Sequence, residues 1–75
     1  MNLFEAKLNA NCIIKAVEVE DEKTKIRLME LGLIVGTRLV VKYKSIMKKT
    51  LIIFFNSSCF TLKDNLAKKI VVNYA

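Results

Sequence analysis

The segment Arg27–Thr37, RLMELGLIVGT, contains both glycines of a 75-residue chain that has no proline. Glycine adopts positive φ without the Cβ clash that costs other residues about 1 kcal/mol. Gly32 follows an apolar pattern with helical spacing, which predicts a helix end in the left-handed conformation, with Leu33 packing back on the helix. Gly36 fits the third position of a turn over residues 34–37, where positive φ is again needed. The segment therefore predicts a helix end followed by the start of a strand.

The residues before the first glycine predict a short helix over about 22–31. Four apolar residues with helical spacing give it a broad apolar face: Ile26, Leu28, Met29 and Leu31. Asp21 is a suitable N-cap, and the acidic residues around it favour the positive end of the helix dipole.

Short strands are predicted for the rest of the chain. Alternating or β-branched apolar residues mark five segments: 12–17, 37–44, 50–55, 59–63 and 70–74. Asp64 opens a helical turn over about 64–69, before the last strand. Several short strands in so small a chain must close into a barrel or form two packed layers in order to bury one core. The expected fold is mainly β, in one domain spanning residues 1–75.

The alternation also assigns side chains to faces. Cys12, Ile14 and Ala16 share one face of the first strand, and Ile13, Lys15 and Val17 share the other. The second strand is expected to be half-buried and to end in a basic edge, with Leu39, Val41 and Tyr43 on one face and Arg38, Val40, Lys42 and Lys44 on the other. In the fourth strand the inward residues are Phe60 and Leu62.

Cysteine and histidine content argues against a metal centre. The chain has two cysteines and no histidine, whereas a structural tetrahedral site needs four ligands, so no metal or other cofactor is expected within the monomer. Cys12 and Cys59 lie in apolar strand segments and are expected to be reduced, buried thiols. A disulfide between them remains an alternative, because the sequence does not give the distance that separates them. Catalysis is not expected either, because no nucleophile motif, carboxylate pair or phosphate-binding loop is present.

Positive charge is concentrated in the second half of the chain. Residues 1–37 hold five basic and six acidic groups, whereas residues 38–75 hold eight basic groups and one acidic group. This asymmetry suggests an anionic partner, namely nucleic acid, a phospholipid surface or an acidic protein face, or else a lysine-rich soluble surface. No apolar window is long enough to span a membrane, and the segment MNLFEAKLN lacks the features of a signal peptide, so we expect a cytoplasmic location.

Two motifs, RLMELGLIVGT at residues 27–37 and FTLKDNLAKKIVV at residues 60–72, resemble those of a known family. The first is similar to R-L-x-E-L-G-L-x-P-G-T, and the second to a pattern of A-L-R/K, a short helix with alanine and an I-x-V ending. Both belong to the ferrous iron transport protein A (FeoA) family, whose SH3-like domain also occurs at the C-terminus of DtxR-type iron-dependent repressors. Val35 replaces the family's proline, Asn9 and Ala10 replace a Pro-Gly turn, and the hairpin over 44–49 also departs from the family pattern.

The resemblance implies a small SH3-like β-barrel of about five strands, with one short helix after the first strand and the helical turn before the last. It further implies a cytoplasmic accessory or regulatory module of bacterial ferrous iron uptake. The implied partner is FeoB, a membrane transporter with a cytoplasmic GTP-binding domain. Arg38 could in principle assist phosphoryl transfer on that domain. The favoured alternative is that Arg27 pairs with Glu30 and that Arg38 lies on a solvated strand face.

Two surfaces are candidates for contact with a partner. The first is the loop of Leu33, Ile34 and Val35, and the second is the hairpin tip of Ile46, Met47, Lys48 and Lys49. An apolar pair rimmed by lysines suits a partner with an apolar pocket and an acidic rim. For Leu33 the alternative role is packing in the core. For the hairpin tip the alternative is an ordinary exposed turn or a lid on the end of the barrel.

Nucleic-acid binding by a small basic barrel is the main functional alternative. The basic second half supports it. The aromatic residues, however, mostly alternate with core positions, and the basic residues are nearly all lysines, whereas single-strand binders expose aromatic platforms in a basic groove. A third alternative is the regulatory module of an iron-dependent repressor. The starting methionine and the short length argue against this alternative and favour a free-standing protein.

Overall fold

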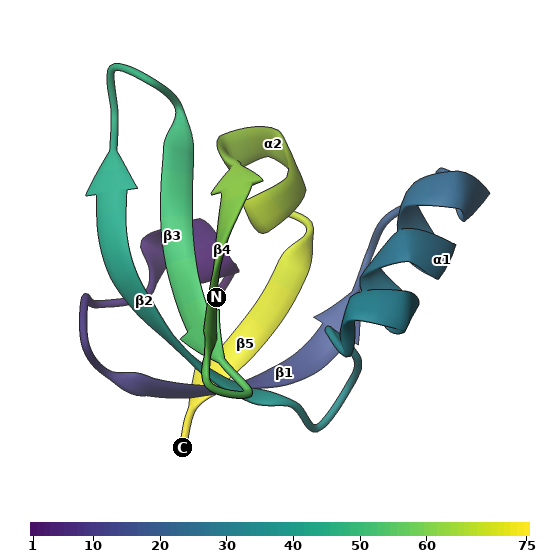
Figure 1. Ribbon diagram of the computed structural model, residues 1–75, viewed down its shortest axis with the longest axis horizontal. Coiled ribbons are helices and arrows are strands. Elements are labelled where there is room, and N and C mark those ends of the chain that lie inside the picture. Colours follow the sequence, from purple (N-terminus) through teal and green to yellow (C-terminus); the bar gives the residue numbers. More distant parts are fainter.

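Five antiparallel strands form one curled sheet, and a helix stands beside it (Figure 1). The computed structural model describes residues 1–75. In chain order the elements are the 3-10 helix η1 (Leu3–Glu5), β1 (Asn11–Val17), α1 (Glu22–Leu31), β2 (Arg38–Ser45), β3 (Thr50–Phe55), β4 (Ser58–Lys63), α2 (Asp64–Ala67) and β5 (Ile70–Tyr74). The strand order is β4-β3-β2-β1-β5. The predicted class, a mainly β, SH3-like fold with one short helix after the first strand, is confirmed.

The concave face of the sheet encloses a core that is entirely apolar. Sixteen of the 75 residues are buried, and none of them is polar or charged. β1 pairs with β2 on one side and with β5 on the other, which brings the last strand beside the first. α2 connects β4 to β5 (Figure 1). Its Ala67 is fully buried. These pairings allow five short strands to share one core.

A β-bulge in β2 changes the faces that alternation predicts. The register against β3 shifts between Val41 and Tyr43, so one residue has no partner there. An extra residue in one strand moves every later side chain to the other face. Tyr43 is therefore exposed, and Lys44 is half-buried with its ammonium donating a hydrogen bond to the carbonyl oxygen of Ala6. The predicted faces of Tyr43 and Lys44 are wrong for this reason.

A second shift lies in β1, where the register against β5 changes between Ile14 and Ala16. Val17 then lies opposite the buried Ile70 and packs against the core. The predicted grouping of Val17 with Ile13, on the face opposite Ile14, is wrong, because the bulge reverses the alternation after Ile14.

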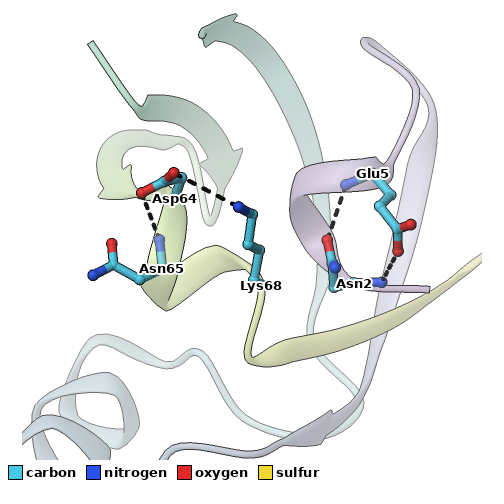
Figure 2. Close-up of polar contacts among 5 residues, drawn as sticks. All are labelled: Asn2, Glu5, Asp64, Asn65 and Lys68. Atoms are coloured by element: carbon cyan, nitrogen blue, oxygen red, sulfur yellow. Dashed lines mark hydrogen bonds and ion pairs between the residues drawn. The ribbon is translucent and has the colours of Figure 1, made fainter. Parts of the chain in front are cut away.

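The N-terminal residues form an element that the sequence analysis did not predict. The side chain of Asn2 accepts a hydrogen bond from the backbone N–H of Glu5, and the Glu5 carboxylate accepts one from the backbone N–H of Asn2 (Figure 2). This capping box satisfies two donors at the start of η1. It places Leu3 inside the core, fully buried, while the carbonyl oxygen of Met1 accepts a hydrogen bond from Val72 at 2.9 Å. The Asn-x-x-Glu spacing of Asn2 and Glu5 is the sequence pattern that could have predicted this capping box.

The glycine-containing segment has the predicted conformation. Gly32 ends α1 at φ 95°, and its N–H donates to the last helical carbonyls. The N–H of Leu33 donates to the carbonyl oxygen of Leu28 at 2.9 Å, and Leu33 is buried. Gly36 has φ 94°, and residues 34–37 close a turn through a 3.0 Å hydrogen bond. The predicted helix over about 22–31 and both glycine turns are confirmed.

The helical turn before the last strand is shorter than predicted, covering four residues rather than six. The Asp64 carboxylate accepts a hydrogen bond from the backbone N–H of Asn65 at 2.8 Å and lies 3.8 Å from the ammonium group of Lys68 (Figure 2). The carboxylate therefore lies at the positive end of the turn, where it is stabilised. Residues 68 and 69 form a turn, and β5 begins at the buried Ile70.

The two cysteines have different environments. Cys12 is fully buried in β1, whereas Cys59 is exposed, and both are free thiols. Cys59 lies opposite Phe54 on the outer face of β3 and β4, so the prediction of two buried thiols is wrong for Cys59. Burial raises the pKa of the Cys12 thiol, and the nearby positive charge of Lys44 partly offsets this rise.

Replacing either glycine with alanine should destabilise the fold through backbone strain alone. A Cβ at Gly32 would lie 3.7 Å from the Phe55 ring, an ordinary contact, and a Cβ at Gly36 would have no atom within 4 Å. We expect Gly32→Ala and Gly36→Ala each to lower the free energy of unfolding by about 1 kcal/mol, because an L-residue is strained at these φ values. Asparagine tolerates this conformation, so Gly36→Asn should lose less in urea denaturation. Equal stability of wild type and Gly36→Ala would contradict the account.

Thiol labelling should separate the two cysteines. We expect Cys59 to react with a disulfide reagent at once, and Cys12 to react only as fast as the protein opens, because its thiol is buried and its pKa is raised. The Cys59→Ser variant should therefore show one slow thiol and no fast one. Two thiols that react at equal rates in the native protein would contradict the burial of Cys12.

The same burial predicts the direction of a pH effect. Because the folded state favours the neutral thiol, the unfolded chain loses this proton first as pH rises above the ordinary cysteine value of 9.0. The contribution of Cys12 to stability is complete below that pH and is lost above it. The variants Cys59→Ser and Cys12→Ala/Cys59→Ser have the same titrating groups except for the Cys12 thiol. In urea denaturation, the free energy of unfolding should fall more between neutral and alkaline pH for Cys59→Ser than for the double variant.

Candidate functional site: an apolar groove between the helix and the first strand

The helix α1 leaves most of its apolar face uncovered. It stands to one side of the curled sheet (Figure 1), and Leu28 is its only buried residue. Ile26 is 51% exposed and Met29 is 59% exposed, with Leu31 also exposed. The predicted apolar face therefore exists, but the core covers only one residue of it. Uncovered apolar side chains that gather in one place are typical of an interaction site.

A groove of about 590 Å³ lies between α1, β1 and the loop that follows α1. Six of its eight lining residues are hydrophobic. The lining residues are Lys15, Ala16, Val17, Lys25, Met29, Leu33, Ile34 and Val35. No acidic residue is among them, so the groove is an apolar surface with two positive charges at its rim.

Backbone and threonine hydrogen bonds hold the wall formed by the loop. The Thr37 hydroxyl donates to the carbonyl oxygen of Gly32 at 2.7 Å and accepts from the N–H of Ile34 at 3.3 Å. The N–H of Gly36 donates to the carbonyl oxygen of Ile14 at 2.8 Å, which fastens the loop to β1. The loop is thereby ordered before any partner binds, so binding there loses little conformational entropy.

The start of α1 carries negative charge and lies outside the lining of the groove. Asp21 occupies the N-cap position, and its carboxylate accepts a 2.6 Å hydrogen bond from the Thr24 hydroxyl. This hydrogen bond holds the pKa of Asp21 below its ordinary value. Asp21 therefore remains ionised well below neutral pH, as a helix N-terminus favours.

The structure separates the two predicted contact surfaces. Of the predicted loop, Ile34 and Val35 are exposed at the groove, whereas Leu33 is buried and has the core role that the sequence analysis gave as its alternative. The hairpin tip between β2 and β3 lies on the side of the molecule away from α1 (Figure 1). There Ile46 is 82% exposed and Met47 is 95% exposed.

Sequence reasoning missed several residues of the groove and misplaced others. Met29 and Val17 line it, although Met29 was assigned only to the apolar face of the helix and Val17 only to the strand face that it shares with Ile13 and Lys15. No local signal distinguishes an apolar helix residue that packs from one that stays exposed. The predicted Arg27–Glu30 pair is also wrong, because the only ion pair in the structure joins Asp64 and Lys68.

Arginine and aromatic positions bear on the alternative functions. Arg38 is exposed on β2, in agreement with the expected solvated face. The aromatic residues were expected mostly to alternate with core positions rather than to form exposed platforms; Tyr43, Phe54 and Tyr74 are nevertheless exposed. The Lys42 ammonium lies 5.9 Å from the centre of the Phe54 ring and partly covers it.

Two further properties concern metals and membranes. No group of three or more histidine, cysteine, aspartate or glutamate side chains is placed to hold a metal ion. None of the helices has the length and hydropathy needed to cross a bilayer.

Comparison with known proteins agrees with the architecture. The FeoA protein from Chlorobium tepidum superposes with a TM-score of 0.88 at 27% identity, covering 99% of this chain and 70% of that one. Iron(II) transport protein A from Clostridium thermocellum gives 0.86 at 20% identity, covering 99% and 45%. A manganese-dependent transcriptional repressor gives 0.90 at 15% identity, covering 100% and 41%. At these two lower identities the likeness shows a shared fold alone.

No curated protein matches the chain in a sequence search. The family model described as the FeoA domain matches residues 1–74, nearly the entire length. This match confirms the resemblance that the RLMELGLIVGT motif carries. The chain belongs to the FeoA family.

Proposed function

We propose that this protein is a docking module that binds the cytoplasmic part of a FeoB-type ferrous iron transporter through the groove beside α1. Membership of the FeoA family implies a role in ferrous iron transport systems. The observation that carries the proposal is the groove itself, an apolar concavity of about 590 Å³ that the protein's own core leaves open. A concave apolar site with few polar groups is the usual form of a recognition site.

The groove also suggests what it binds. Met29, Ile34 and Val35 offer apolar contact, and Lys15 and Lys25 offer positive charge at the rim. A segment with two or three apolar side chains and a flanking carboxylate complements such a surface, because apolar burial supplies affinity and charge supplies orientation. We therefore assign the transporter contact to an apolar, acidic segment of its cytoplasmic domain.

A cytoplasmic location and a non-catalytic role are parts of the same proposal. A module that only docks needs no catalytic group, and Arg38 lies on β2, outside the groove lining. Adding the protein to the transporter's GTP-binding domain should then give the same hydrolysis rate with wild type and with Arg38→Ala. A loss of stimulated hydrolysis in Arg38→Ala would assign that arginine a part in phosphoryl transfer instead.

Substitutions on one helix test the groove directly. Met29 lines the groove and Ile26 does not, yet the two lie on the same helix with similar exposure, 59% and 51%. Burying a methionine side chain contributes about 1.5–3 kcal/mol. Met29→Ser should therefore raise the Kd for the transporter's cytoplasmic domain about tenfold or more in calorimetry, and Val35→Ser should act in the same direction.

The matched control is Ile26→Ser, which removes a similar apolar area outside the groove and should leave the Kd unchanged. Both variants change exposed residues, so their stabilities should stay within about 0.5 kcal/mol of wild type. Equal Kd values for wild type, Met29→Ser and Val35→Ser would reject the groove as the contact surface.

A further inference from the structure

The hairpin between β2 and β3 ends in the two most exposed apolar side chains of the molecule, Ile46 at 82% and Met47 at 95%. They are adjacent, and neither lines a groove or pocket. They lie in the turn that joins β2 to β3, at the projecting end of the hairpin (Figure 1). An exposed apolar tip at the end of a hairpin suits an apolar phase into which it can insert.

The tip is held in one conformation by hydrogen bonds on both of its sides. The N–H of Lys48 donates to the Ser45 hydroxyl at 3.2 Å. The carbonyl oxygen of Lys49 accepts a 2.8 Å hydrogen bond from the N–H of Asp64, which ties the hairpin to the end of β4. The side chains of Ile46 and Met47 are thereby presented on a fixed turn, so little order has to be gained on binding.

Positive charge surrounds the tip. Lys48 and Lys49 belong to the turn itself, Lys63 lies in β4 opposite Thr50, and Lys68 follows α2. The one acidic residue of the hairpin, β4 and α2 is Asp64, which is paired with Lys68. The other six acidic residues lie in η1, in α1 or in the segment before α1. The tip is therefore apolar at its apex and cationic around it.

We propose that this tip binds directly to the surface of an anionic phospholipid bilayer, with Ile46 and Met47 at the acyl boundary and Lys48, Lys49 and Lys63 at the headgroup phosphates. The combination of an apolar wedge and basic residues is what such a surface recognises. A protein partner would need a cavity matched to the tip, and a nucleic acid offers no apolar phase for the Ile46–Met47 pair. The bilayer therefore fits both the apolar and the charged parts.

The location of the tip is compatible with simultaneous docking. α1 lies on one side of the molecule and the hairpin on the other (Figure 1), and the groove is lined by residues of α1, of β1 and of the loop that follows α1. A membrane transporter presents its cytoplasmic domain close to the bilayer, so the two contacts could be made together. The lipid contact does not depend on the groove, and each can be tested without the other.

Vesicle sedimentation tests the proposal with the protein as it is. We expect binding to vesicles of equal parts phosphatidylcholine and phosphatidylglycerol, little binding to pure phosphatidylcholine, and release by salt as screening increases. Each lysine near such a surface raises partitioning about fivefold, so Lys48→Gln/Lys49→Gln should bind about twenty-five-fold more weakly. The matched charge control is Lys23→Gln/Arg27→Gln on α1, which should bind like wild type.

Insertion of the apex needs its own measurement. Ile46→Ser/Met47→Ser should weaken vesicle binding about tenfold or more and leave binding to the transporter domain unchanged. The chain has no tryptophan, so Met47→Trp provides a single reporter whose emission should shift to the blue on anionic vesicles. Val35→Trp, in the groove, should not shift.

Three results would overturn the lipid contact. The first is absence of wild-type binding to anionic vesicles. The second is unchanged vesicle binding by Ile46→Ser/Met47→Ser together with lost binding to the transporter domain, which would make the tip a protein contact. The third is displacement from vesicles by single-stranded DNA with no blue shift of Met47→Trp, which would assign the lysines to nucleic acid.

Discussion

The attachment of the loop over residues 32–37 to β1 is the constraint on which the functional surface depends. Ile14 is the anchor, because its carbonyl oxygen accepts the N–H of Gly36 at 2.8 Å and its N–H donates to the carbonyl oxygen of Thr37 at 2.9 Å. With these bonds formed, Leu33 is buried, α1 ends beside the sheet and β2 begins next to β1. Since Ile14 is itself fully buried, the loop can shift only if the core shifts with it.

Features with a local cause were predictable from the sequence. Gly32 and Gly36 defined the helix end and the following turn, because only a residue without a Cβ adopts φ near +95° at no steric cost. The bounds of α1 followed from its spacing and from Gly32. The role of Thr37 was not predicted, because a threonine there is equally typical of a strand start, and its two hydrogen bonds depend on the loop being folded.

Features with a tertiary cause were not predictable. Tyr43 and Lys44 exchange faces because of a bulge. A glycine within the strand would have indicated a bulge, but β2 contains none. Cys59 is exposed because the outer face of β3 and β4 has no layer above it, which an apolar strand pattern does not reveal. The groove exists because α1 packs through Leu28 alone, and the exposure of Met29 follows from that packing and not from its spacing.

The position of β5 beside β1 has a consequence for biosynthesis. Cys12 is paired with Tyr74 and Val17 with Ile70, so the first strand has both of its neighbours only when the last one arrives. While the ribosome's exit tunnel still shields residues 70–74, β1 retains an open edge, and such edges are where nascent chains associate wrongly. This sheet therefore closes only after residues 70–74 have left the tunnel, rather than growing gradually as translation proceeds.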